Sequence, residues 1–141
     1  MYQLIRKYES CELTSYKCPA GYWTIGYGSR FLKDGSSVKQ GMKISYSEAD
    51  ELLEDYVKKN IEPCVNSMNI NFSMEQKEAL YSLIYNVGVN AFNKSKLKKA
   101  IVENNLEEIF KQWDWFKAGG KVLKGLVKRR AEELFLFTKD I

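Results

Sequence analysis

The sequence predicts one α+β domain, with a small antiparallel sheet near the start of the chain and helices after it. Its 141 residues are close to the commonest length of a single domain and too few for two independent cores. Hydrophobic residues make up 45% and charged residues 28%, the proportions of a globular protein. Short β-rich segments fill residues 13–38, whereas the apolar spacing after residue 45 indicates amphipathic helices.

The chain opens with an expected helix over residues 2–12. Leu4, Ile5 and Tyr8 recur at one-turn spacing and form its apolar face. Glu9 falls near the C-terminal end of this helix, where the helix dipole disfavours a carboxylate anion. A glutamate in that position is costly, which indicates a functional use.

Two strands are expected next, at Thr14–Lys17 and Tyr22–Tyr27. The segment 18–21 between them, Cys-Pro-Ala-Gly, suits a tight turn because proline presets one backbone angle and glycine accepts a positive φ. A second turn is expected at Asp34-Gly35. The resulting sheet is too small to be stable alone.

Helices are expected for all of the chain after residue 45. Pro63 ends or kinks the first of them, and Gly88 is the expected C-terminal end of the second. Further helices begin near Leu97, Leu106 and Leu123, with loops at Asn104-Asn105 and Gly119-Gly120. The first two are opened by capping boxes, Ser45-x-x-Glu48 and Ser73-x-x-Gln76.

The charge and the absence of certain residues limit the function classes. A net charge of +4 favours an anionic partner, which the residues leave open among nucleic acid, a membrane surface and an anionic polysaccharide. No apolar run of about 18 residues and no secretory signal occur in the given chain. With no histidine and no C-x-x-C pair, we expect no metal and no cofactor.

Cysteine usage raises a specific question about Cys18. The chain has three cysteines, Cys11, Cys18 and Cys64, an odd set of which Cys64 is expected to be a buried apolar filler. Cys11 and Cys18 are seven residues apart and are candidates for a local disulfide. Composition alone leaves Cys18 as a core residue, half of a bridge or an active-site group.

The spacing around Cys18 resembles a known catalytic signature. Glu9, eight residues, Cys18, five residues and Thr24, followed by Ile-Gly-Tyr-Gly, is similar to the Glu-x8-Asp-x5-Thr pattern of the phage-type lysozymes, or endolysins (glycoside hydrolase family 24), with the cysteine that a subset has in place of aspartate. The sequence departs from the family pattern at Ser29, where the family usually has a histidine, and at Lys96, where it often has a threonine. It continues in the family's order nearly to the end of the chain, over residues 44–49, 79–80, 85–88, 92–97, Trp113 or Trp115, 119–120 and 125–132.

The resemblance implies a lysozyme-like fold and a muramidase activity on the peptidoglycan glycan strand. Glu9 is then the general acid that protonates the leaving oxygen, and Cys18 and Thr24 handle the water or nucleophile. Glu12 is the rival acid but lacks the family's register. Substrate contacts are expected from the aromatic residues Tyr22, Tyr27 and Phe31, from the backbone at Gly28, and from Asn86 and an inward-pointing Arg130.

The resemblance also implies two lobes flanking a cleft. The expected β-rich lobe with its bridging helix spans about 13–58, and the helical lobe contains 1–12 and 59–141, all within one lysozyme domain over 1–141. We expect a monomer that binds no nucleic acid and does not insert stably into a membrane. It is expected in the host cytoplasm until release to the periplasm or cell wall, and a preceding N-terminal export anchor is compatible with this.

A Cys11–Cys18 disulfide is a candidate regulatory device, since the resemblance is to a family in which some exported members lock their active sites in this way. The alternative is that Cys11 is a small core residue and Cys18 always has a free thiol. Two other activities compete with a muramidase. A lytic transglycosylase needs Glu9 alone, and a catalytically inactive module would only bind the cell wall. A basic nucleic-acid binder is disfavoured because the lysines at 96–99 lack interleaved aromatic residues.

Overall fold

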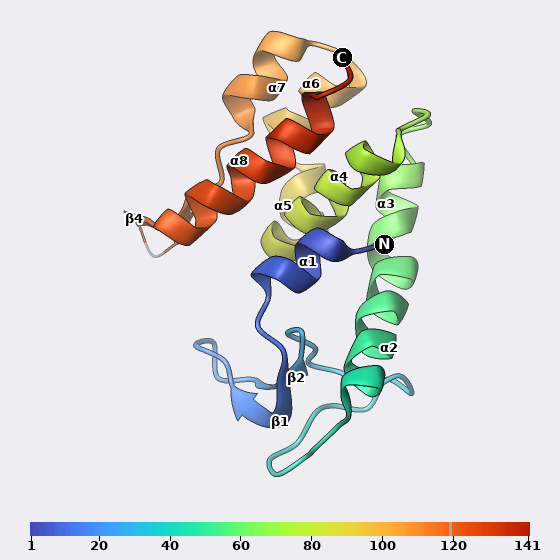
Figure 1. Ribbon diagram of the computed structural model, residues 1–141, viewed down its shortest axis with the longest axis vertical. Helices are drawn as coiled ribbons and strands as arrows, with labels where there is room; N and C mark the ends of the chain where they lie inside the picture. Colours follow the sequence, from blue (N-terminus) through green and yellow to red (C-terminus); the bar gives the residue numbers. More distant parts are fainter. Residues whose placement is uncertain (119) are drawn as a thin grey trace. The chain divides into compact units, whose positions relative to one another are not determined.

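The structure is a computed structural model that describes residues 1–118 and 120–141. It contains helices and a small antiparallel sheet, which confirms the predicted α+β class (Figure 1). The chain divides into two compact units, one of Ile5–Lys59 and the other of Met1–Leu4 with Asn60–Ile141. Residues 5–12 therefore lie with the sheet, whereas the sequence placed residues 1–12 with the helical lobe.

The first helix is shorter than predicted. Helix α1 spans Gln3–Tyr8, and its last backbone hydrogen bond runs from Glu9 N–H to the carbonyl of Ile5 at 2.8 Å. Strand β1 begins soon after, at Glu12–Lys17. The predicted helical end at residue 12 is wrong because β1 pairs with a partner strand, and that pairing overrides the local helical pattern.

Strands β1 and β2 form the predicted antiparallel hairpin. Strand β2 spans Trp23–Gly26, and Lys17 of β1 pairs with Trp23. The loop between them is closed by a hydrogen bond of 2.8 Å from Gly21 N–H to the carbonyl of Cys18, and Gly21 has a φ of +87°. This geometry matches a three-residue hairpin loop ending in a left-handed residue, for which glycine is the favoured choice.

Gly26 sits where the sheet meets the next helix. Its φ is +68°, and a Cβ built on it would lie 3.4 Å from the Cβ of Ala49 and 3.5 Å from Ile44 Cδ1. The close backbone approach that glycine permits here is thus to helix α2, which spans Tyr46–Tyr56. The small core beside it is formed by Ile25, Val38 and Leu52, with Trp23, Leu32, Met42 and Ile44 packed around it.

Helix α2 opens and ends as the sequence predicts. Both hydrogen bonds of the Ser45–Glu48 capping box are present. A π-helical turn, Val57–Ile61, separates α2 from α3, which spans Glu62–Asn66. Pro63 explains the turn, because its ring lacks an N–H and clashes with the carbonyl one turn earlier, and widening the helix relieves the clash.

The larger unit contains α4 at Met74–Val87, α5 at Val89–Asn93, α6 at Lys96–Val102, α7 at Leu106–Gln112 and α8 at Lys124–Thr138. Helices α4 and α8 pack against each other (Figure 1). The Ser73–Gln76 capping box opens α4, and Gly88 ends it, as predicted. Helix α5 was not predicted from the sequence.

The expectation that everything after residue 45 is helical is wrong in one place. Strands β3, Lys117–Ala118, and β4, Lys121–Val122, pair antiparallel before α8. The predicted loop there falls partly on Gly119, which lies outside the described residues. Strands of two residues carry too little periodic pattern for sequence reasoning to detect.

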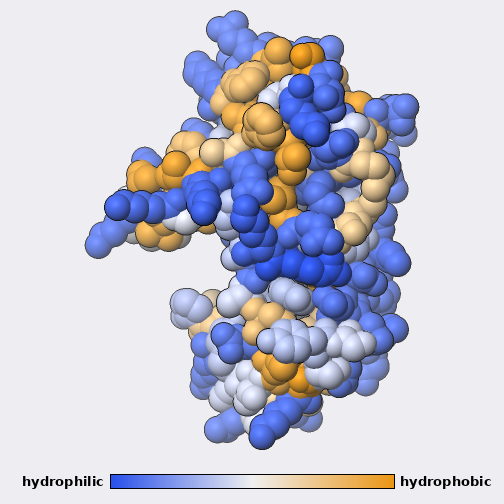
Figure 2. Space-filling model, in the orientation of Figure 1, coloured by the Kyte–Doolittle hydropathy of each residue, from blue (hydrophilic) through white to orange (hydrophobic). Residues whose placement is uncertain are grey.

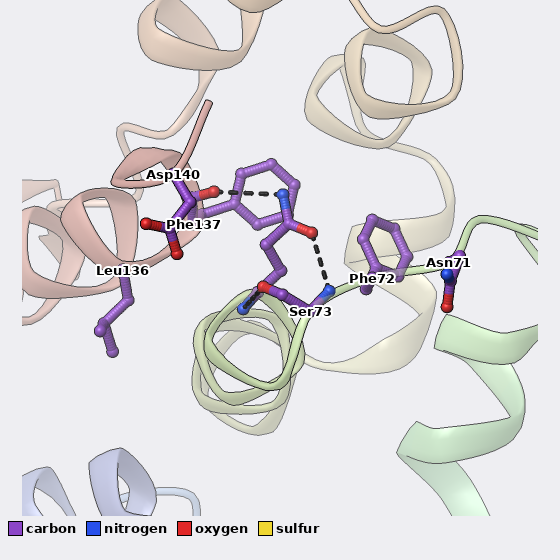
Figure 3. A pocket seen from close by; sticks show the side chains of 7 residues that line it. Asn71, Phe72, Ser73, Leu136, Phe137 and Asp140 are labelled. Atoms are coloured by element: carbon purple, nitrogen blue, oxygen red, sulfur yellow. Dashed lines mark hydrogen bonds between the residues drawn. The ribbon is translucent and has the colours of Figure 1, made fainter.

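A pocket of about 330 Å³ lies where the start of α4 faces the end of α8. Figure 3 shows Phe72 and Ser73 on one side of it and Phe137 and Asp140 on the other. Gln76 bridges these two helix ends, because its amide nitrogen donates to the Phe137 carbonyl at 3.3 Å. None of the predicted site residues lines this pocket.

The surface carries hydrophobic residues in small groups among hydrophilic ones, as the face in Figure 2 shows. Among the residues described, no helix combines the length and apolar character needed to cross a membrane.

Candidate active site

Cys18 occupies the first position of the hairpin loop. The backbone N–H groups of Tyr22 and Ala20 point at its sulfur and, with the Thr24 hydroxyl and the charge of Arg30, lower the pKa of the thiol. Main-chain N–H groups that converge on one atom make an anion-binding concavity. The loop therefore favours the thiolate form of Cys18.

The main-chain carbonyl of Tyr22 holds Thr24 next to Cys18. Its side chain is 3% exposed, and its hydroxyl donates to the Tyr22 carbonyl at 3.0 Å. That carbonyl also accepts from Cys18 N–H at 2.9 Å. The Thr24 hydroxyl lies within hydrogen-bonding reach of the Cys18 sulfur as well. The strand thus fixes the position of both side chains relative to each other.

The negative charges of Glu9 and Cys18 both raise the pKa of the Tyr16 phenol. Tyr16 lies on β1, and burial raises the pKa of its phenol, with further increases from the negative charges of Glu12, Cys18 and Glu9. Since such effects fade beyond about 10 Å at moderate salt, Glu9 and Cys18 lie within electrostatic range of one phenol.

Tyr16 and Arg30 were missed by the sequence reasoning. The guanidinium carbon of Arg30 lies 3.5 Å from the centroid of the Tyr22 ring and 5.7 Å from that of Phe31. A basic residue placed just after the Gly-Tyr-Gly run and beside an aromatic residue was the available signal for Arg30. Tyr16 carried no signal, because its direction depends on an irregularity in β1.

Cys11 lies in a different environment from Cys18. Its half-buried thiol interacts with the Tyr27 side chain, and burial raises the pKa of Cys11 despite the opposing effect of that hydrogen bond. Burial also raises the pKa of Tyr27, and the charges of Cys11 and Asp50 add to the increase. Cys11 is therefore the less nucleophilic of these two thiols at neutral pH.

Cys11 and Cys18, the predicted disulfide pair, form no disulfide in this structure. Glu12, next to Cys11, pairs with Gly26, whereas Cys18 bonds to Tyr22, so the length of β2 separates the two cysteines. Four strand residues span about 13 Å, and a disulfide needs Cα atoms about 4.4–6.8 Å apart. The seven-residue spacing suggested a closed loop, but those residues form an extended strand.

The other predicted substrate contacts are distributed over both units. Tyr22 and Phe31 are 50% and 53% exposed, so their rings are available to a ligand. Gly28 is exposed with a φ of +101°, in a turn closed by reciprocal hydrogen bonds between Ile25 and Ser29. Asn86 is exposed in the last turn of α4 and belongs to the larger unit.

Arg130 lies in a buried ionic network of the larger unit. Its side chain has no exposed surface, and its Nε lies 2.8 Å from Glu133 Oε1. Arg129, Ser82 and Trp113 also contact the Glu133 carboxylate. Burial raises the pKa of Glu133, while Arg130 and the other contacts oppose the increase. In this structure, Arg130 is buried too deeply for the direct saccharide contact we predicted, and the network instead ties α8 to α4.

The described residues contain no group of three or more His, Cys, Asp or Glu side chains arranged to hold a metal ion. Cys64 is buried, and its sulfur lies 3.3 Å from Asn93 Oδ1.

Comparisons with known proteins agree with the predicted fold and family. The endolysin of Bacillus phage PZA is 34% identical over 95% of this chain and 52% of its own length. The solved structure of the endolysin from Escherichia coli O157:H7 phage FAHEc1 superimposes with a TM-score of 0.85 at 30% identity, covering 99% of this chain and 91% of that one. The muramidase domain of SpmX from Asticaccaulis excentricus gives a TM-score of 0.83 at 29% identity over 97% of this chain and 93% of that one.

Two further facts define the scope of this similarity. The chain spans about half the length of the Bacillus phage relatives that it matches. The family model described as Phage lysozyme matches residues 6–133, which covers most of both units and includes Glu9, Cys18 and Thr24. The chain therefore belongs to the phage lysozyme family and has the lysozyme-like fold.

Proposed function

We propose that this chain hydrolyses the β-1,4 bond between N-acetylmuramic acid and N-acetylglucosamine in bacterial peptidoglycan. Its family and the names of its relatives, endolysin and muramidase domain, support this assignment. The observation that carries the proposal is local to one unit. Cys18 and Thr24 share the Tyr22 carbonyl, and Glu9 and Cys18 both act on the Tyr16 phenol.

Each of these residues has a role that glycoside cleavage needs. The leaving oxygen must be protonated, and the developing oxocarbenium ion must meet a water or nucleophile on the opposite face of the sugar. Glu9 is partly exposed at the end of α1, where it can donate a proton to a bound substrate. The Cys18 thiolate accepts a proton from the attacking water or attacks the sugar itself. The Thr24 hydroxyl orients the attacking group.

The charge of the protein suits such a substrate. Peptidoglycan carries carboxylates on its muramyl and peptide groups, and a protein with a net charge of +4 is attracted to an anionic polymer. The exposed rings of Tyr22 and Phe31 offer stacking surfaces for sugars close to the hairpin loop.

Redox control is a separate part of the proposal. We infer that a Cys11–Cys18 bridge requires a conformation in which β1 is released from β2, because the hairpin pairing holds the two cysteines apart. Control of this kind would act through refolding of the hairpin and not through a simple closure of two neighbouring thiols.

The assignment of Glu9 is tested by comparing Glu9→Gln with Glu12→Gln on purified peptidoglycan. Glu12 is the matched control because it is an exposed glutamate on the same hairpin. Removing a general acid typically costs about 10²–10⁴ in rate, so we expect a loss of that size for Glu9→Gln and near-normal activity for Glu12→Gln. Undiminished activity of Glu9→Gln would remove Glu9 from the mechanism.

A further inference from the structure

Arg30 is fixed beside the hairpin loop by its backbone and by two aromatic rings. Its carbonyl accepts a hydrogen bond from Val38 N–H at 3.0 Å. Its guanidinium stacks on the Tyr22 ring, 3.5 Å from the ring centroid, with Phe31 on a more distant side at 5.7 Å. Stacking on an aromatic face leaves the N–H donors of an arginine free to act on other groups.

Tyr22 connects this cation to the candidate catalytic groups. The ring of Tyr22 holds Arg30, while its main chain bonds to Cys18 in both directions and its carbonyl accepts from Thr24. One residue thus positions the guanidinium, the thiol and the hydroxyl relative to one another.

We propose that Arg30 is a positioning residue for the reaction, which acts through Cys18 by keeping its sulfur in the thiolate form. This inference rests on the proposed function, since it assigns the thiolate a role in cleavage of the glycan. Arg30 would then compensate for the higher ordinary pKa of a thiol compared with that of a carboxyl group.

The need for such a cation follows from the chemistry of a thiol. An aspartate has an ordinary pKa of about 3.9 and is ionised at neutral pH without help, whereas a free cysteine has a pKa of about 8.5. Backbone N–H groups of the loop favour the thiolate, and the charge of Arg30 acts in the same direction. A guanidinium is not deprotonated in proteins, so an arginine is a suitable residue for this role.

Other charged and titratable groups also face this region. Tyr16 of β1 is close to Cys18, but burial raises the pKa of its phenol, so that it stays neutral where the thiol titrates. Glu9 and Glu12 act on the same phenol. The Lys17 ammonium lies over the Trp23 ring, 5.5 Å from its centroid. Arg30 is the cation whose charge lowers the pKa of Cys18 in the structure.

The test measures the thiol directly, without relying on enzyme activity. Iodoacetamide reacts with the thiolate, so the rate of its reaction with Cys18 follows the ionised fraction; mass spectrometry of the Cys18 peptide distinguishes this site from Cys11 and Cys64. Rates would be measured across a pH series for the wild-type chain, Arg30→Gln, Arg30→Lys and Lys33→Gln. Lys33 is the matched control, because it is an exposed cation in the same unit.

We expect Arg30→Gln to shift the reaction profile to higher pH and to slow the reaction at pH 7 by well under tenfold, since one pKa unit changes the thiolate fraction about tenfold and the N–H groups of the loop contribute more than Arg30. Arg30→Lys should retain part of the effect, and Lys33→Gln should match the wild type. Identical profiles for Arg30→Gln and the wild type would overturn the proposal. Circular dichroism checks that each variant is folded.

The same variants separate this proposal from the proposed function. In a Cys18→Asp background the carboxylate is already ionised at neutral pH, so Arg30→Gln should no longer shift the pH profile of peptidoglycan cleavage. If alkylation shifts but no variant cleaves peptidoglycan, the proposed function fails and the role of Arg30 in ionising Cys18 stands. If the wild type cleaves peptidoglycan but Arg30→Gln leaves the alkylation profile unchanged, the proposed function stands and the role of Arg30 in ionising Cys18 fails.

Discussion

Cys18 shows how one loop position can serve both structure and chemistry. The first position of a tight turn favours side chains that accept main-chain hydrogen bonds, which is why Asp, Asn and Ser are common there. Here a sulfur takes that place and receives the N–H groups of Tyr22 and Ala20. The same contacts that fit a cysteine into the turn also favour its reactive ionised form.

A substitution series at Cys18 tests its chemical role. Because the thiol must be deprotonated to act, wild-type activity should rise with pH through a thiol pKa that lies below the ordinary value, as the hairpin loop lowers it. Cys18→Asp should keep activity and move this rise to lower pH, since a carboxyl ionises earlier. Cys18→Ser should lose most activity.

The measurement is the rate of peptidoglycan cleavage from about pH 5 to 9, a range that covers the ordinary thiol pKa. A Cys18→Ser variant with the rate and pH profile of the wild type would show that the sulfur has no chemical role and that Cys18 serves the turn alone.

Sequence spacing identified the candidate residues Glu9, Cys18 and Thr24 but not the residues that surround them. Glu9, Cys18 and Thr24 are identified by their separations, and the hairpin brings them into one unit. Tyr16 could not be predicted, because the register of β1 shifts between Glu12 and Tyr16, and such an irregularity changes which face a side chain occupies. The position of Arg30 could not be predicted either, because it depends on the path that the chain takes after β2.

At the scale of elements, the helix starts were the most predictable features. Ser45 and Ser73 each open a helix at the predicted residue, because a capping box places a side-chain acceptor and donor at fixed spacing. Helix α5 escaped prediction because Gly88 both ends α4 and begins a helix of only five residues. The end of α1 was misplaced because strand pairing is not a local property.

The contact of β2 with α2 gives a prediction about stability. Gly26→Ala and Gly41→Ala should lower the free energy of unfolding by similar amounts. Both positions have positive φ, which costs an L-residue about 1–2 kcal/mol. The Cβ at Gly26 would meet Ala49 only at the ordinary van der Waals distance of 3.4 Å, and nothing lies within 4 Å of a Cβ at Gly41.

Urea denaturation of the two variants provides the comparison. A clearly larger loss for Gly26→Ala would contradict this expectation and show that the approach of β2 to α2 adds a steric penalty to the backbone conformation.

The hairpin pairing also predicts the response of the cysteines to oxidation. Mild oxidation of the folded protein should produce no Cys11–Cys18 bridge, because β1 keeps the two thiols apart. Peptide mapping without reduction measures the bridge. A bridged peptide from folded protein, with activity restored by a reductant, would instead establish the redox lock expected from the sequence.

At the scale of the whole molecule, the family match extends over both units, while Glu9, Cys18 and Thr24 all belong to Ile5–Lys59. The larger unit contributes the exposed Asn86 and a core braced by the Glu133 network. The similarity therefore concerns the entire fold and not a short motif, which is why fold and family could be inferred from motif order alone. How residues of the larger unit take part in binding depends on packing that sequence spacing does not encode.

Hydrolysis of peptidoglycan with Glu9 as the acid is tested by mass analysis of the soluble fragments released from purified peptidoglycan, with Glu9→Gln as the matched negative variant. We expect fragments that end in a reducing N-acetylmuramic acid, each carrying one added water, and almost none from Glu9→Gln. Anhydro-muramic ends would instead identify a lytic transglycosylase. An absence of fragments from the wild type would identify a wall-binding module, and either result would overturn the proposed hydrolysis.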